Sequence, residues 1–254
     1  MITVCIATYN GSRYIAQQLM SILPQLGEND EIVISDDGST DDTVDIIRTF
    51  DDRRIKIVEN NVEKYADKSA KSYTDKHRNS SLIRNFENAL RHANGDYIFL
   101  ADQDDCWMHN KIEVCTRLLK DNYCIVSDAE VTDSILRPTG MSLYEMMKTK
   151  PGRLYNLLWH NGYTGCCMAF RREVLQKALP FPENIPMHDI WIGNVAAYFF
   201  NVRFTGERLI YFRRHQNATS RNGKGSNFSV MQKLSFRWNT IRHLIHTRLK
   251  QRKA

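Results

Sequence analysis

The sequence predicts an α/β fold in which a mostly parallel, Rossmann-like β-sheet is flanked by helices on both sides. Three observations support this prediction. Short apolar runs rich in β-branched residues alternate with segments whose apolar residues recur every three or four positions. The runs stop at polar or turn residues, as expected of strands buried on both faces. Several of these stops are rich in acids, and the carboxyl ends of parallel strands meet at one edge of a sheet, where ligands bind.

Five runs are expected to form strands. They are ITVCIATY at 2–9, EIVISDD at 31–37, RIKIVEN at 54–60, YIFLAD at 97–102 and CIVSDAEV at 124–131. The intervals between the first four runs carry helical spacing. Apolar residues mark a first helix through Tyr14, Leu19, Ile22, Leu23 and Leu26, a second through Val44, Ile47 and Phe50, and a third through Leu82, Ile83, Phe86, Ala89 and Leu90. This alternation of strand and helix predicts a sheet with helices on both faces.

The length and composition fit a globular domain. With 254 residues, of which 42% are hydrophobic, the chain can bury a substantial core. No segment approaches the roughly 18 uncharged apolar residues of a membrane span, and MITVCIATYN lacks the basic start and the cleavage site of a signal peptide. The six cysteines include no C-x-x-C pair, so they are expected to be reduced thiols rather than disulfides or zinc ligands. A cytoplasmic protein is expected.

The net charge of +6 is unevenly distributed along the chain. No Asp or Glu follows Glu207, whereas 12 of the 35 Lys and Arg residues lie between positions 208 and 253. The preceding residues therefore carry 23 basic against 29 acidic side chains. A basic tail on a mildly acidic body indicates an anionic partner surface for the tail, either a membrane or a nucleic acid.

Polar residues gather where three of the runs end. The first run ends in Thr8, Tyr9, Asn10 and Gly11, the second in Asp36, Asp37, Gly38 and Ser39, and the fourth in Asp102, Gln103, Asp104 and Asp105. Carboxylates this close repel one another unless a cation lies among them, and Mg²⁺ or Mn²⁺ prefers carboxylate and phosphate oxygens. We therefore expect this edge to hold a ribose and base, with Asp102 and Asp104 beside a metal that bridges a diphosphate.

Each acidic motif also has a purely structural interpretation. DDGSTDD is typical of a turn followed by a helix N-cap, with Ser39 or Thr40 as the capping residue. DQDD could be a solvated acidic loop, although Gln103 and Trp107 interrupt a simple capping pattern. Neither G-x-G-x-x-G after the first run nor G-x-x-x-x-G-K-[ST] occurs, which argues against dehydrogenases and P-loop proteins.

Three segments carry a resemblance to a known family. VCIATYNGSRYIAQQLMSIL, EIVISDDGSTDDT and NFENALRHANGDYIFLADQDDCW, in this order, resemble the nucleotide-sugar-binding half of a family 2 glycosyltransferase with the GT-A fold. The resemblance covers residues 2–131 and extends more loosely to about 220. DQDDxW with HDIW and RRHxxNxS is similar to bacterial transferases of O-antigen and capsule synthesis, including rhamnosyl-, glucosyl- and galactosyltransferases. It implies a transferase domain at 1–220, with a nucleotide-sugar-binding half at 1–131 and an acceptor-binding half at 132–220, followed by a tail at 221–254.

The resemblance implies roles for the donor-binding residues. Thr8, Tyr9 and Asp36 would contact the uracil or thymine and its ribose, and Asp37 would support that loop. Asn10 belongs to the same donor-binding edge.

Other positions would bind the diphosphate and metal. Asp102 and Asp104 match the D-x-D motif of the family, with Asp104 as the more direct ligand of Mn²⁺ or Mg²⁺, and Gln103 lies between them in the donor site. His215 falls where some relatives bring a late histidine to the diphosphate and metal, although a structural histidine fits the sequence equally well.

The second half of the resemblance implies one catalytic residue and two phosphate contacts. Relatives often carry an acidic pair where this chain has His188 and Asp189, so Asp189 would be the catalytic base. A plain helix N-cap is the alternative role for Asp189. Arg213 and Arg214 could add positive charge at the diphosphate.

Two segments lie apart from these motifs. Residues 62–81 are polar and poor in aliphatic side chains, which predicts a mobile loop near the donor site or an inert insertion. The tail spaces Leu234, Trp238, Ile241, Ile245 and Leu249 at steps of three and four among basic residues. This pattern predicts an amphipathic helix that lies on an anionic membrane or packs its apolar stripe on the body.

Together these observations predict an inverting, metal-dependent glycosyltransferase. The donor would be a UDP-hexose or dTDP-rhamnose, and the acceptor a lipid-linked oligosaccharide at the inner face of a bacterial cell membrane. A nucleotidyltransferase remains an alternative, although TYNGSRY lacks a phosphate loop rich in glycine and lysine. A nucleic-acid-binding protein would explain the basic tail but leaves the acidic strand ends unexplained, so no nucleic-acid partner is expected.

Overall fold

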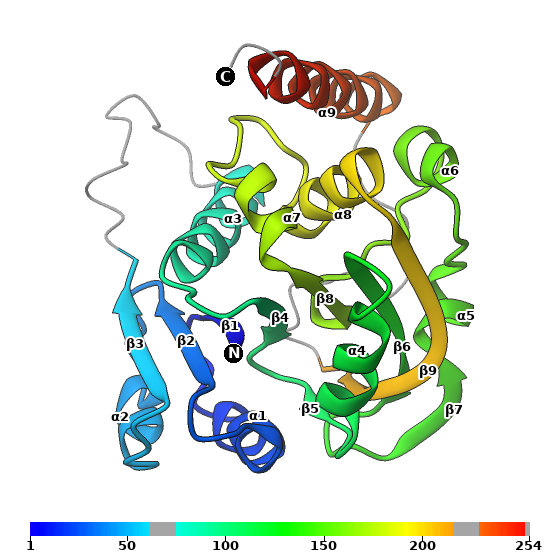
Figure 1. Ribbon diagram of the computed structural model, residues 1–254. Helices are drawn as coiled ribbons and strands as arrows, with labels where there is room; N and C mark the ends of the chain where they lie inside the picture. Colours follow the sequence, from blue (N-terminus) through cyan, green and yellow to red (C-terminus); the bar gives the residue numbers. More distant parts are fainter. Residues whose placement is uncertain (61–74, 216–228, 252–254) are drawn as a thin grey trace.

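The computed structural model describes residues 1–60, 75–215 and 229–251 (Figure 1). Within this part of the chain nine strands form one mixed sheet in the order β3-β2-β1-β4-β8-β6-β9-β5, with β7 paired to β6. The strands are β1 Ile2–Thr8, β2 Glu31–Asp36, β3 Ile55–Glu59, β4 Tyr97–Asp102, β5 Cys106–Trp107, β6 Cys124–Thr132, β7 Pro138–Ser142, β8 Met168–Arg171 and β9 Val202–Arg213.

The five predicted strands are confirmed as β1, β2, β3, β4 and β6. β3, β2, β1 and β4 pair in parallel, and their register sets Thr8 beside Asp36 and Ala7 beside Asp102. β8 pairs antiparallel with both β4 and β6, so strands from the two predicted halves alternate in one sheet. The prediction that the strands are buried on both faces was wrong for β3, an edge strand whose residues are only half-buried or exposed.

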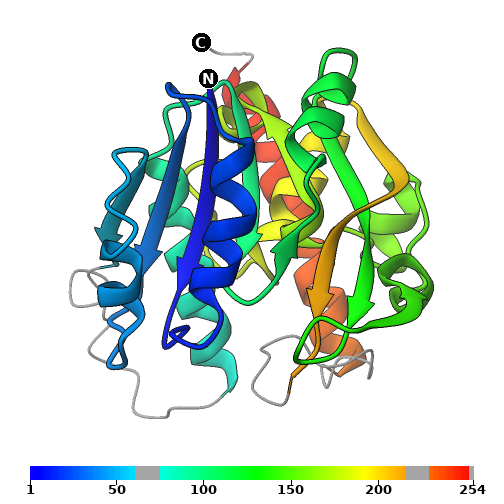
Figure 2. The same cartoon turned by 90° about the horizontal axis from the view of Figure 1, so that it is seen from below.

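Helices cover both faces of the sheet, as Figures 1 and 2 show. α1, α2 and α4 lie on one face, whereas α3, α7 and α8 lie on the other, and α9 crosses over α8. The helices are α1 Ile15–Ile22, α2 Thr43–Arg48, α3 Asp75–Arg91, α4 Lys111–Leu119, α5 Leu143–Met147, α6 Arg153–Leu158, α7 Arg172–Ala178, α8 His188–Phe199 and α9 Val230–Gln251.

Two helix boundaries differ from the sequence-based prediction. The first helix ends at Ile22 and continues as a 3₁₀ turn, Leu23–Gln25, because Pro24 cannot donate a backbone hydrogen bond. The predicted loop at 62–81 was wrong from Asp75 onward, where α3 already begins. Packing of the apolar face of α3 on β1 and β2 extends the helix into a polar segment that has no apolar periodicity of its own. Residues 62–74 lie outside the described part of the chain.

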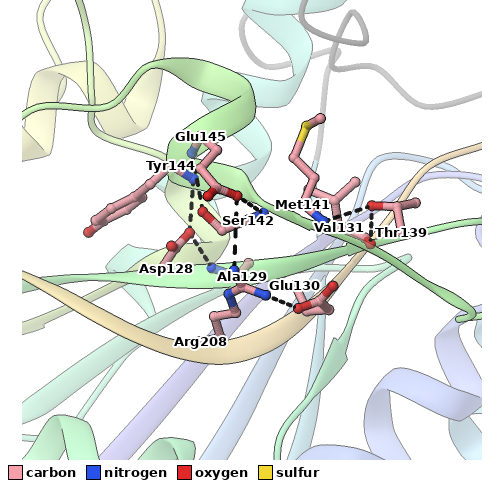
Figure 3. A network of polar contacts seen from close by, with 10 residues as sticks. All are labelled: Asp128, Ala129, Glu130, Val131, Thr139, Met141, Ser142, Tyr144, Glu145 and Arg208. Atoms are coloured by element: carbon pink, nitrogen blue, oxygen red, sulfur yellow. Dashed lines mark hydrogen bonds and ion pairs between the residues drawn. The ribbon is translucent and has the colours of Figure 1, made fainter.

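A network of hydrogen bonds and ion pairs connects the start of α5 to β6 and β9 (Figure 3). Asp128 on β6 accepts a hydrogen bond from the Tyr144 backbone N–H at 2.9 Å, and Glu130 pairs with Arg208 of β9. Ser142 and Glu145 form a reciprocal capping box at the start of α5, with N–O distances of 3.2 and 2.7 Å. These contacts hold α5 against the edge of the sheet.

α9 confirms the predicted tail helix, but its orientation could not be predicted. Thr240 and Leu244 are buried against the body. The predicted apolar stripe instead faces outward, with Leu234, Trp238, Ile245 and Leu249 exposed and Ile241 partly buried. Packing of the stripe on the body is therefore not what the structure shows.

Candidate active site

Thr8 and Asp36 end two neighbouring strands and bond to each other. The Thr8 hydroxyl donates to Asp36 Oδ1 at 2.9 Å. Asp36 also accepts bonds from the backbone N–H groups of Gly38 and Ser39 at 3.1 and 2.8 Å, and from the Ser39 hydroxyl at 2.6 Å. Gly38 has φ +77°, which favours glycine in this turn. The turn after β2 is thereby fixed around one buried carboxylate.

Ser39 and Thr40 do not cap α2, although Asp41 of DDGSTDD accepts the N–H of Thr43, the first residue of α2, at 3.1 Å. α2 begins after Asp42, whose side chain makes no capping hydrogen bond. Ser39 instead bonds to Asp36 and accepts the Asn10 N–H at 2.9 Å, while Asn10 Oδ1 accepts the Thr40 N–H at 2.8 Å. The DDGSTDD segment therefore joins the ends of β1 and β2.

Gln103 joins the end of β1 to the end of β4. Its Oε1 accepts the Tyr9 N–H at 3.0 Å, and its Nε2 donates to the Tyr9 carbonyl at 3.2 Å. A Cβ at Gly11 would lie 2.2 Å from Gln103 Oε1, so a larger residue there would displace the Gln103 side chain from these bonds. The Tyr9 side chain remains exposed at the edge.

Asp37 bonds to two neighbouring segments, and its supporting role in the donor loop stays a prediction. It accepts a hydrogen bond from Asn60 Nδ2 at 2.7 Å and another from the Ser81 hydroxyl. It therefore ties the end of β2 to the end of β3 and to α3.

Asp102, Asp105 and Cys166 form a buried cluster in which one ligand atom from each residue lies within 4.8 Å of the others. Burial, followed by the charges of Asp104 and Asp189, raises the pKa of Asp102 to about 7. Burial, followed by the charges of Asp104 and Asp102, raises the pKa of Asp105 well above its usual range. Uncompensated negative charge is therefore concentrated in this cluster.

A buried lysine supplies part of the missing positive charge. Lys111 Nζ donates to the Cys166 carbonyl at 2.9 Å and lies 4.8 Å from the centroid of the Trp107 ring. Its charge lowers the pKa of Asp102, but burial and the two neighbouring acids outweigh it. The sequence reasoning missed Lys111 and Cys166, because no motif or spacing marks either of them.

The donor set fits a divalent cation. Among the described residues Asp105 Oδ2 is buried without a hydrogen-bond partner, and Asp102 contributes a second carboxylate beside it. Carboxylate oxygens are the ligands that Mg²⁺ and Mn²⁺ prefer, whereas the Cys166 thiol suits softer metals.

Asp104 and His215 lie together at the side of this cluster. His215 Nε2 is 2.8 Å from Asp104 Oδ2, and its ring centroid lies 4.7 Å from that of Tyr14. The late histidine thus lies beside Asp104 of the D-x-D motif. Whether it contacts a metal stays a prediction.

The side chain of Arg213 is buried and bonds to other groups of the protein. Its guanidinium donates to the Asp104 carbonyl at 2.7 Å, to the Ser134 carbonyl at 2.8 Å and to Gln17 Oε1 at 2.6 Å. Its backbone N–H donates to Asp105 Oδ1 at 3.0 Å. This geometry favours a role for Arg213 in positioning the 104–105 loop. The predicted contact of Arg213 with phosphate stays a prediction.

Arg214 lies against the end of β6 and against α5. Its backbone N–H donates to the Thr132 carbonyl at 3.0 Å, and its Nη1 lies 3.7 Å from Met146 Sδ. Its predicted contact with a diphosphate also stays a prediction.

Asp189 is the second residue of α8, and Met187 rather than Asp189 is the N-cap. Its carboxylate accepts N–H groups from Gly165 at 3.1 Å and from Ile190 at 2.6 Å. Burial raises the pKa of Asp189 to about 6, which suits a base that works near neutral pH. Its charge contributes to the raised pKa of Asp102, so the candidate base lies beside the acidic cluster.

His188 is buried next to this base. Its ring stacks on Phe86 with centroids 3.9 Å apart, and burial lowers its pKa to about 3. Both ring nitrogens lack a hydrogen-bond partner within the described chain. His188 is therefore a neutral side chain in a position where the resemblance leads one to expect an acid.

Curated relatives of the chain are bacterial glycosyltransferases. It is 33% identical over 230 residues to UDP-Glc:alpha-D-GlcNAc-diphosphoundecaprenol beta-1,3-glucosyltransferase WfaP of Escherichia coli, covering 87% of this chain and 80% of that protein. It is 27% identical to the Escherichia coli enzyme of the same activity named WfgD, covering 72% of this chain but only 64% of that protein. It is also 27% identical to dTDP-rhamnosyl transferase RfbG of Shigella flexneri, covering 89% and 76% of the two chains.

Solved structures of similar fold show less sequence identity. The S. aureus TarS 1-349 complex with UDP-GlcNAc matches with a TM-score of 0.64 and 16% identity, covering 97% of this chain and 66% of that one. Mannosyltransferase PcManGT from Pyrobaculum calidifontis, in complex with GDP-Man and Mn²⁺, matches with a TM-score of 0.58 and 20% identity, covering 86% and 58%. These likenesses confirm the predicted GT-A fold.

The family assignment rests on the extent of the match as well as on these relatives. The sequence profile described as glycosyl transferase family 2 matches residues 3–179, which include β1 through β8 and the acidic cluster. The chain therefore belongs to glycosyl transferase family 2.

Proposed function

We propose that this protein is an inverting, metal-dependent glycosyltransferase of bacterial surface-polysaccharide synthesis. It moves a sugar from a nucleoside-diphosphate sugar to a lipid-linked saccharide. The observation that carries the proposal is the position of Asp189, whose carboxylate accepts the N–H of Gly165, the residue next to Cys166 of the acidic cluster. A candidate base and a candidate diphosphate site therefore lie next to each other.

The donor is a UDP-hexose or dTDP-rhamnose. WfaP and WfgD are named as users of UDP-Glc, and RfbG as a dTDP-rhamnosyl transferase. In this chain Thr8 and Asp36 hold the floor of the nucleotide site, and the exposed Tyr9 ring is available to the base. Asn10 and Gln103 keep the surrounding loops in place.

Asp102 and Asp104 would hold the metal, with Asp105 and His215 as neighbouring groups. When bound, a divalent cation such as Mn²⁺ or Mg²⁺ would neutralise the charge that develops on the leaving diphosphate. Arg213 keeps the 104–105 loop in position through its bonds to Asp104 and Asp105.

Asp189 removes the proton from the acceptor hydroxyl as that oxygen attacks the anomeric carbon. The attack comes from the face opposite the nucleoside diphosphate, so the anomeric configuration inverts. One carboxylate suffices for this step, and no covalent nucleophile is required. The N–H groups of Gly165 and Ile190 hold the carboxylate in one orientation.

The acceptor is a saccharide on a lipid diphosphate, as the names of WfaP and WfgD indicate for those enzymes. No helix in the described ranges is both long and apolar enough to span a bilayer. The protein would reach such an acceptor from the cytoplasmic surface of the cell membrane, where the outward-facing stripe of α9 would contact anionic lipid.

A thermal-shift panel of nucleoside-diphosphate sugars tests this function. With Mn²⁺ present, the cognate donor at 100 times its Kd should raise the free energy of unfolding by roughly 2.7 kcal/mol and shift the melting temperature accordingly. Matched nucleoside monophosphates without the diphosphate serve as controls. Equal protection by nucleic-acid oligomers, with none by any donor, would contradict the proposal.

The rate of transfer should depend on pH through Asp189. The base must be ionised, and its raised pKa of about 6 means that kcat/KM should fall about tenfold per unit as pH drops below 6. The profile is measured at saturating Mn²⁺, because protons and metal compete for Asp102, whose pKa is about 7. The fall in kcat/KM then reports on Asp189. A profile that stays flat from pH 7 to pH 5 would exclude a titrating carboxylate base.

A further inference from the structure

We propose that α6 and α9 together form one surface that docks on an anionic lipid bilayer. The proposal rests on the proposed location at the membrane and extends the contact from the tail helix to a helix of the transferase body. We call the residues that form it the α6–α9 surface, namely Leu154, Leu158, Trp159, Leu234, Trp238, Ile245 and Leu249.

α9 is oriented with a large part of its apolar surface toward solvent. Thr240 and Leu244, the latter 2% exposed, pack on the body, whereas Trp238 on the opposite face is 66% exposed. Amphipathic helices of globular proteins normally bury the apolar face, because burial is what stabilises their position. The outward stripe of α9 is therefore a surface without a partner in the described chain.

α6 adds a second exposed apolar patch. Leu154 and Leu158 lie four residues apart on one face of the helix, and Leu154 is 65% exposed. Trp159 follows the last helical residue and is 70% exposed. Large side chains that are exposed singly are common, but three within six positions mark an interaction surface.

Specific contacts fasten the two helices to the same part of the body. Arg237 Nη2 on α9 donates to the Trp159 carbonyl at 2.7 Å. The guanidinium groups of Arg153 on α6 and Arg248 on α9 lie 4.7 and 5.8 Å from the centroid of the same Tyr198 ring. Figure 1 shows α9 across α8, with α6 beside its N-terminal half. The two helices that carry the patches therefore meet at the Arg237–Trp159 contact.

The charges around the surface identify a bilayer as its partner. Arg242 is exposed among the apolar residues of α9, whereas Arg237 and Arg248 contact the body, and no acidic residue follows Glu207 in the sequence. Long basic side chains reach toward anionic headgroups while their neighbours enter the acyl boundary. Tryptophan is enriched at that depth, and one lies on each helix.

Two contact points would fix the orientation of the enzyme, which one helix alone would leave free to roll. Figure 2 shows the N-terminal end of α9 at the edge of the molecule where the parallel strands end. That edge carries Asp102 and Asp104, so the bilayer would lie near the candidate metal site.

Tryptophan fluorescence tests the two helices separately. Trp107 and Trp191 are buried, so the response to lipid comes from Trp159 and Trp238. Trp238→Phe leaves Trp159 as the exposed reporter, and Trp159→Phe leaves Trp238. With vesicles of phosphatidylglycerol and phosphatidylcholine, both variants should show a blue shift that salt weakens. Vesicles of phosphatidylcholine alone should give a much smaller shift.

Vesicle sedimentation gives the matching loss of binding. Leu154→Glu should reduce partitioning onto anionic vesicles about tenfold or more, because a charge replaces an apolar side chain at the interface. Met20→Glu is the matched control, since Met20 is 64% exposed on α1 at the far side of the molecule and should bind as the parent does.

The outcomes distinguish this inference from the proposed function. A shift of Trp238 without a shift of Trp159 overturns the α6–α9 surface but leaves the tail as the membrane contact. If neither tryptophan shifts, both the α6–α9 surface and the membrane contact of the tail are contradicted. A blue shift of Trp159 that depends on protein concentration in the absence of lipid identifies contact between copies of the chain and also overturns the inference.

Discussion

Replacing Asp189 with Asn is expected to leave donor binding intact and to reduce turnover by about 10²-fold to 10⁴-fold, the range typical for loss of a general base. Asn keeps the size of the side chain but cannot accept a proton at neutral pH. The charge near the reacting carbon is lost as well. Calorimetric affinity for the donor nucleotide and the rate of transfer to a lipid-linked acceptor measure the two effects separately.

The structure adds a condition to this experiment. Both carboxylate oxygens of Asp189 accept backbone N–H groups, one from Gly165 and one from Ile190. Asn has only one oxygen, so its amide N–H₂ faces one of these donors and costs about 1–3 kcal/mol of stability. The melting temperature must therefore be measured on the same sample, at a temperature where the variant is folded.

A transfer rate close to that of the parent would show that Asp189 only positions the start of α8. His188 would then be the first alternative to examine. Its burial lowers its pKa to about 3, so it is neutral at working pH and could accept a proton only weakly. A shift of donor affinity equal to the loss in rate would assign Asp189 to substrate binding instead.

Replacing Asp104 with Ala is expected to abolish the strengthening of UDP or dTDP binding by Mn²⁺ while the fold survives. Asp104 is partly exposed, and its carboxylate contacts His215 at 2.8 Å, so its removal leaves the core intact. Calorimetry with and without Mn²⁺ gives the ratio of affinities, which should fall to about one because a metal ligand is lost.

Asp45→Ala is the matched control for this substitution. Asp45 lies on α2 with a side chain that is 79% exposed, and it pairs only with Arg48 at 3.4 Å in the described structure. It should keep the metal dependence of the parent. Unchanged metal dependence in a folded Asp104→Ala protein would instead remove Asp104 from the metal site and leave the buried pair of Asp102 and Asp105 as the candidate.

Local patterns in the chain were sufficient to predict the donor half. β1, β2 and β4 follow directly from short apolar runs, and the motifs at their ends lie where parallel pairing brings them. The family prediction is confirmed by the match over residues 3–179. These features depend on the alternation of strand and helix along the chain, which is visible without knowledge of distant contacts.

Burial in the acidic cluster could not be predicted in this way. Lys111 and Cys166 are 55 residues apart, and only the packing of α4 beside β8 brings the ammonium to the Cys166 carbonyl. Arg213 was expected at the diphosphate because it is basic, but the pairing of β9 with β5 and β6 turns it toward Asp104, Ser134 and Gln17.

The fold class, the family and the acidic strand ends could be predicted from the sequence alone, because strand period, helix period and motif order are local properties of the chain. Which groups are buried, and which way amphipathic faces turn, depends on tertiary packing. The stripe of α9 shows the difference, since its spacing predicts a helix but is compatible with either orientation. Leu244 fills the contact with the body, and that contact leaves Trp238 and Leu234 facing outward. Burial depends on surfaces supplied by residues far away in the sequence, which no local pattern records.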